Sequence, residues 1–169
     1  MSEQEEVAEY LNRFEEIVRK TLEDPEKYER FIRAGYDHEK AKRGLAWLAK
    51  MDVLEFLERG AESVYVPIGT QLKTVRLEIV GETEKAWKVS CHSSFFDRPL
   101  VEWVPKSQSR RVGTGLFLKS WLIRKVPSYL SYCLRDAAIE FVAIHLAKKS
   151  GEYKEVADQL FEWVVKLYE

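Results

Sequence analysis

The spacing of apolar residues changes twice along this chain, and the two changes limit the folds open to it. Up to residue 60, and again beyond residue 114, apolar residues recur every three or four positions, which predicts helices with one buried face. Between residues 64 and 105 they alternate with polar ones, as in Val75, Leu77 and Ile79, which predicts the strands of a half-buried sheet. This order of helices, strands and helices predicts an α+β fold.

We expect about six helices packed around one small antiparallel β-meander of three to four strands, because the predicted strands are joined by short, turn-rich connections. The first three helices should follow Ser2, Asp24 and Asp37, whose side-chain oxygens can cap a helix N-terminus. A short helix is expected to follow Thr114. A long helix over residues 129–149 is apolar nearly all round, which predicts a place at the centre of the fold.

The bulk properties favour a single domain over residues 1–169, helical over 1–60, a sheet over 64–105 and helical over 114–169. A chain of 169 residues that is 46% hydrophobic can bury one core. The acidic N-terminus is unlike a signal peptide, and no apolar run reaches bilayer length, so we expect a cytoplasmic protein that does not bind membranes. Abundant Lys, Arg and Glu with only 2 Met is a composition typical of thermophiles.

Templates for metal binding and nucleophilic catalysis do not fit the sequence. His38, His92 and His145 have no second ligand at metal-binding spacing. Cys91 and His92 are neighbours, so on a strand their side chains would point to opposite faces. We expect Cys91 and Cys133 to be buried thiols rather than a disulfide. The sequence therefore predicts no catalytic residue, no metal and no cofactor, and it favours a non-catalytic protein over an enzyme.

Charge is distributed unevenly along the chain. The net charge is −5 over residues 1–63, +6 over residues 64–126 and −2 over residues 127–169. Residues 98–125 hold seven basic side chains against one acidic side chain, that of Glu102. Lys and Arg bind nucleic-acid phosphates, and hydroxyl or amide groups such as those of residues 107–109 help to position them. We predict that phosphates are contacted by Lys106, Arg110, Arg111, Lys119, Arg124 and Lys125.

Two alternatives stay open at this point. Trp103 and Trp121 flank the basic segment and could stack on bases, but both also fit core positions. The basic side chains could equally pair with carboxylates of the acidic N-terminal helices. The rival hypothesis is a protein–protein interaction module without nucleic-acid binding, such as a partner adaptor or a homodimer through the last helix with Trp163 and Tyr168 as anchors.

One segment carries a resemblance. The run Glu82-Thr83-Glu84-Lys85-Ala86-Trp87, followed by Trp103-Val104-Pro105-Lys106-Ser107-Gln108, resembles a short β-hairpin signature of uncharacterised prokaryotic, phage and plasmid proteins. The resemblance covers residues 82–108 only. It implies that the strand at 85–87 pairs with the strand at 103–105. Some proteins with this signature are found among replication and recombination functions, so the resemblance favours a non-catalytic nucleic-acid-binding accessory protein of a mobile element and implies no catalytic residues.

Overall fold

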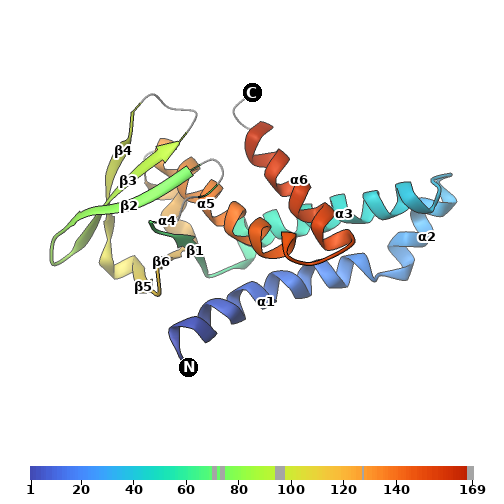
Figure 1. The fold of residues 1–169 in the computed structure, drawn as a ribbon, viewed down its shortest axis with the longest axis horizontal. Helices are drawn as coiled ribbons and strands as arrows, with labels where there is room; N and C mark the ends of the chain where they lie inside the picture. The colour runs from blue at the N-terminus through green and yellow to red at the C-terminus, as the bar shows by residue number, and fades with distance from the viewer. Residues whose placement is uncertain (70–71, 73–74, 94–97, 127, 167–169) are drawn as a thin grey trace.

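The computed structural model describes residues 1–69, 72, 75–93, 98–126 and 128–166 (Figure 1). This described part holds six α-helices and six β-strands, and the strands form two three-stranded antiparallel sheets. The predicted α+β class is confirmed. The prediction of one small meander is wrong, because a second sheet forms from segments that lie far apart in the sequence.

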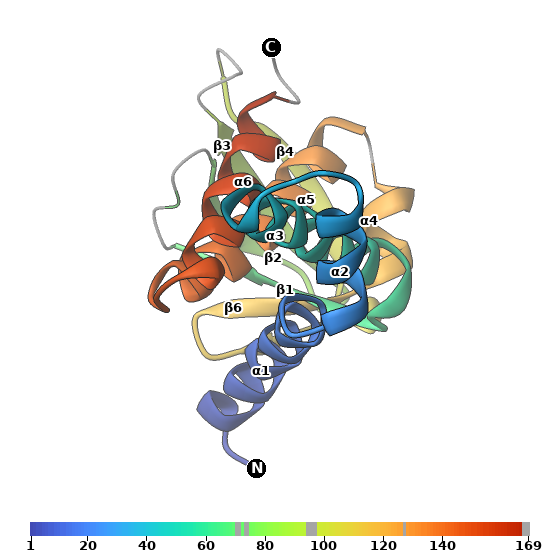
Figure 2. The ribbon, with the colours of Figure 1, turned by 90° about the vertical axis from the view of Figure 1, so that its right-hand side faces the viewer.

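The N-terminal helices form an elongated arm. Helices α1 (Glu3–Leu22), α2 (Pro25–Arg33) and α3 (His38–Glu55) begin at the predicted caps. The Ser2 hydroxyl and the Asp24 and Asp37 carboxylates accept hydrogen bonds from backbone N–H groups of the first turn. Helices α1 and α3 lie along each other with α2 at the far end, and Figure 2 looks along this arm from its α2 end, with the sheets behind. A π-helical turn, η1 (Phe56–Gly60), ends α3.

The predicted meander is the first sheet, made of β2 (Val75–Glu82), β3 (Ala86–Ser93) and β4 (Leu100–Pro105). Its strands follow the alternation of the sequence, which places Leu77 and Val89 in the core. The pairing expected between residues 85–87 and 103–105 is present, since Ala86 lies opposite Pro105 and Trp87 opposite Val104. The β2–β3 hairpin extends to the left in Figure 1.

The second sheet has the strand order β1 (Ser63–Pro67), β6 (Gly115–Lys119), β5 (Ser109–Val112), and a 3₁₀ turn, η2 (Lys106–Gln108), joins β4 to β5. The prediction of a helix after Thr114 is therefore wrong, and helix α4 (Ser120–Lys125) begins only after β6. An unbroken apolar run such as 116–118 suits a buried strand as well as a helix. Pairing with β1 and β5 on both sides favours the strand.

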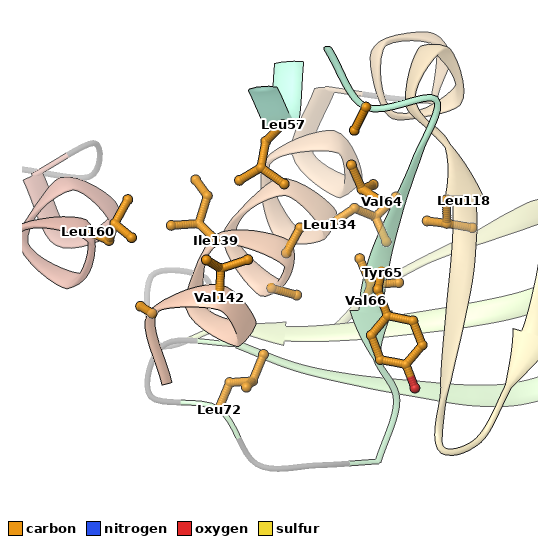
Figure 3. Packing of buried hydrophobic residues seen from close by; sticks show 14 of the residues in the cluster. Leu57, Val64, Tyr65, Val66, Leu72, Leu118, Leu134, Ile139, Val142 and Leu160 are labelled. Carbon is orange, nitrogen blue, oxygen red and sulfur yellow. The ribbon is translucent and has the colours of Figure 1, made fainter. Parts of the chain in front are cut away.

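Helix α5 (Ser128–Ala147) lies at the centre, as predicted, and contacts both sheets, α1, α4 and α6 (Glu152–Lys166). Its side chains Leu134, Ile139 and Val142 are almost fully buried. Figure 3 shows them gathered with Val64 and Val66 of β1. None of the described helices is both long enough and apolar enough to span a bilayer.

Candidate nucleic-acid interface

The six basic residues predicted to contact phosphates lie in three separate groups. Lys106 and Arg111 lie against the indole of Trp87, with their charged groups 4.3 Å and 5.7 Å from its ring centroid. Lys106 also forms an ion pair with Glu82. Arg111 is exposed and forms no ion pair within the described residues.

Arg110 and Lys119 line a polar cleft of about 550 Å³ between α1 and the second sheet. Both cations are compensated there. Arg110 binds the Glu6 carboxylate of α1, and the Lys119 Nζ lies 2.8 Å from Glu62 Oε1. The hydrogen bond from Arg110 lowers the pKa of Glu6, and that from Lys119 lowers the pKa of Glu62. Pairing of the basic segment with N-terminal carboxylates, one of the two alternatives, is thus present at Arg110.

Arg124 and Lys125 form the third group, at the end of α4. Both side chains are exposed, and within the described part of the chain neither forms an ion pair. Among the residues that the structure describes, Arg111, Arg124 and Lys125 therefore have no ion-pair partner, whereas the other three predicted residues each pair with a carboxylate. The six therefore differ in their partners and in how far their charge is compensated.

The two tryptophans beside the basic segment are not core residues. Trp103 is 43% exposed and Trp121 is 42% exposed, so the core interpretation of both is wrong. Trp103 lies on β4, while Trp121 lies on α4. Both indoles are partly open to solvent, and Trp103 is the one that lies on a sheet surface, with the Lys88 ammonium over its ring.

Sequence reasoning missed that surface, the outward face of the first sheet. Residues on one strand alternate between faces, and Leu77, Val89 and Cys91 face the core. The opposite face, hereafter the outer face, consists of Arg76, Glu78, Lys88, Ser90, His92, Val101 and Trp103. The alternation in β2 and β3 predicts this arrangement. In β4 the run 100–104 is almost wholly apolar, so the sequence alone does not show that Trp103 points outward.

Charge on the outer face is uneven. At one end Arg76 Nε lies 3.2 Å from Glu78 Oε1, and His92 Nε2 lies 3.9 Å from the other oxygen of Glu78. At the other end Lys88 lies directly opposite Trp103, with its Nζ 5.7 Å from the ring centroid, and it forms no ion pair with any described residue. The Lys88–Trp103 end is therefore the positive, aromatic end of the face.

The two cysteines are buried, and the environment of Cys91 does not activate its thiol as a nucleophile. Cys91 and Cys133 are buried free thiols, as predicted. A hydrogen bond with Cys133, burial and the nearby Asp136 charge raise the pKa of Cys91, which keeps its thiol protonated at neutral pH. Sequence reasoning also missed that Asp136 and Glu140, one helical turn apart on α5, are fully buried. Among the described residues no group of three or more His, Cys, Asp and Glu could hold a metal ion.

No protein-family model, curated protein or solved structure matches this chain.

Proposed function

We propose that this protein is a non-catalytic nucleic-acid-binding accessory protein that holds a single strand on the outer face of the β2–β3–β4 sheet. One observation carries the proposal: the exposed indole of Trp103 lies opposite the Lys88 ammonium on this face. An aromatic platform next to a cation is the arrangement that stacks a base and holds its phosphate.

The physical argument favours a single strand over a duplex. The bases of a duplex are stacked on one another, so an exposed indole can stack only on an unpaired base. A ring as open as that of Trp103 contributes about 1–3 kcal/mol per stacked base. Lys88 is the phosphate-binding group of this face, because the Glu78 carboxylate beside His92 would repel a phosphate at the other end.

The basic segment has a secondary part in this proposal. Arg111, Arg124 and Lys125 form no ion pair with the part of the chain that the structure describes, and they add long-range attraction for a polyanion. Lys106, Arg110 and Lys119 would have to exchange a protein carboxylate for a phosphate, so each contributes less than a free cation.

The test is a fluorescence-anisotropy titration of a labelled single strand and of a matched duplex, at about 50 and about 200 mM salt. Trp103→Ala is expected to weaken single-strand binding by about fivefold to 150-fold, the equivalent of one stacked base. Lys88→Ala should reduce the slope of log affinity against log salt by about 0.7. Trp121→Ala is the matched control, because it removes an equally exposed indole from α4. Equal effects of the two tryptophan variants would reject the outer face as the site.

A second arm addresses the basic segment itself. If all six residues contacted phosphates, Arg110→Ala with Arg111→Ala would lower the salt slope by about 1.4 for a single strand. We expect this double variant to lower the salt slope by only about 0.7, because Arg110 is already paired with Glu6, whereas Arg111 forms no ion pair with the described residues and can contact a phosphate. A wild-type protein that binds neither nucleic acid at the lower salt concentration would end the proposal.

An exposed apolar surface on α3 favours the second candidate function, a protein-interaction module. Trp47 and Met51, one turn apart on α3, are 50% and 36% exposed. Trp163, predicted as an anchor, instead packs against the core cluster, and Tyr168 lies outside the described residues. Lys50 lies between the two indoles, 5.2 Å from the Trp47 centroid and 5.4 Å from that of Trp163. Trp47 is thus the indole available to a second copy.

Sedimentation at several concentrations tests this candidate. Wild type should dimerise and Trp47→Ala should sediment as a monomer, because an exposed tryptophan at the centre of an interface supplies much of its affinity. A wild-type monomer at the highest concentration would remove the homodimer.

A further inference from the structure

A pocket of about 370 Å³ lies where η1, α4 and α5 meet. Leu57, Val64 and Ala138 are almost fully buried and form its apolar floor. Figure 3 shows Leu57 and Val64 from within the core. Three arginines from three different elements surround this floor: Arg59 of η1, Arg124 of α4 and Arg135 of α5. We call this site the arginine pocket.

The charge of the arginine pocket is not balanced. Glu58 is the one carboxylate among the described lining residues, and it is 55% exposed with its Oε1 3.9 Å from Arg135 Nη1. Within the described residues, Arg59 and Arg124 take part in no ion pair. Three guanidinium groups therefore share one carboxylate, which is paired with Arg135, and this leaves the pocket with a local charge of about +2.

Arg135 is the most constrained of the three. Its guanidinium lies 5.0 Å from the ring centroid of Tyr132, and its Nε is buried without a hydrogen-bond acceptor among the described residues. A buried donor without an acceptor destabilises the fold unless a partner binds to it. Arg135 lines the pocket, so an anion that enters it brings a hydrogen-bond acceptor to this side chain.

The local backbone is also unusual. The Ala61 N–H donates to Phe56 O at 2.7 Å, closing the wide turn of a π-helix. Single π-helical turns occur often at functional sites. The π-helical turn η1 supplies Leu57 of the apolar floor and Arg59, one of the three arginines around it. The irregular turn and the arginine cluster therefore belong to the same site.

We propose that the arginine pocket binds a small amphipathic anion, a molecule with an apolar body and one carboxylate or phosphate group. Guanidinium groups hold such anions through paired N–H donors, and the apolar floor favours a ligand that also buries hydrocarbon. The volume falls in the range of small-molecule sites. The pocket shares no residue with the outer face, and Arg124 is the one residue that it shares with the basic segment of the proposed function. Binding of a small anion in the pocket does not require nucleic-acid binding.

Isothermal titration with four probes tests the chemistry. Phenyl phosphate and phenylacetate carry both features, phenol lacks the charge, and inorganic phosphate lacks the apolar body. We expect at least one of the two aromatic anions to bind at least about tenfold more tightly than phenol and inorganic phosphate. Whichever of phenyl phosphate and phenylacetate binds more tightly shows whether the pocket prefers a phosphate or a carboxylate group. No binding of either up to millimolar concentration, or binding of inorganic phosphate or phenol as tight as theirs, would overturn the proposal.

The location needs paired variants. Arg59→Gln with Arg124→Gln removes two exposed cations and should weaken binding of the preferred probe at least about tenfold. Arg13→Gln with Arg43→Gln removes two exposed arginines elsewhere, matches the change in net charge and should leave the affinity unchanged. Circular dichroism confirms that both double variants are folded. An unchanged affinity in the first pair, or an equal loss in both, would overturn the assignment to this pocket.

Discussion

Gly115 is a position where one added methyl group should have a large effect. It begins β6 opposite Pro67, and a Cβ built there would lie 2.5 Å from Val66 O and 2.6 Å from the Tyr65 ring. The ring cannot easily move away, because the Tyr65 hydroxyl donates to Val112 O at 2.9 Å and the ring packs on Phe117 at a centroid distance of 4.9 Å. The closest obstacle is backbone, which adjusts less readily than a side chain.

We expect Gly115→Ala to lower the free energy of unfolding by about 2 kcal/mol, within the range of about 1–3 kcal/mol found for overpacked cores. For a chain of this size that corresponds to a fall in Tm of about 4–8 °C. Urea denaturation followed by circular dichroism measures the first quantity, and calorimetry measures the second.

Gly81→Ala provides the matched control. Gly81 also lies on a strand, its added Cβ would approach Lys88 Cβ no closer than 3.6 Å, and neither glycine has a positive φ. Both substitutions reduce the conformational entropy of the unfolded chain equally, which stabilises the folded state by about 0.4–1 kcal/mol in each case. The difference between the two unfolding free energies therefore measures the steric cost at β6. If Gly115→Ala proved as stable as Gly81→Ala, the close packing of Tyr65 on β6 would be refuted.

Three further outcomes are expected. Thiol reagents should modify neither Cys91 nor Cys133 in the native protein at neutral pH and should modify both in denaturant, since both are buried; rapid native labelling would contradict this. Because Arg110 lowers the pKa of Glu6, their pair should stabilise the fold above the ordinary carboxylate pKa of about 4.3 and lose this effect as pH falls further. Glu6→Gln should therefore cost about 0.2–1 kcal/mol at neutral pH and nothing in acid, measured by urea titration at both. Leu134→Ala, at the buried centre of α5, should cost about 2–5 kcal/mol in the same assay, and a cost under about 1 kcal/mol would contradict its place in the core.

Several elements could be predicted from the sequence because the interactions that specify them are local. A helix N-cap acts on N–H groups two or three residues away, so Ser2, Asp24 and Asp37 marked the starts of α1, α2 and α3. The period-two alternation and the short connections gave the β2–β3–β4 meander. The all-round apolar pattern of α5 placed it at the centre.

The tertiary structure alone decided which segments meet. Strand β6 exists because Leu118 pairs with Val64, a partner 54 positions away, and no local pattern separates that strand from a helix. The Arg110–Glu6 pair joins residues 104 positions apart, so the segregation of charge along the chain did not predict which cations stay uncompensated. The arginine pocket likewise combines side chains from η1, α4 and α5. Local periodicity reports which face of an element is buried, whereas the partners of that face depend on how the whole chain packs.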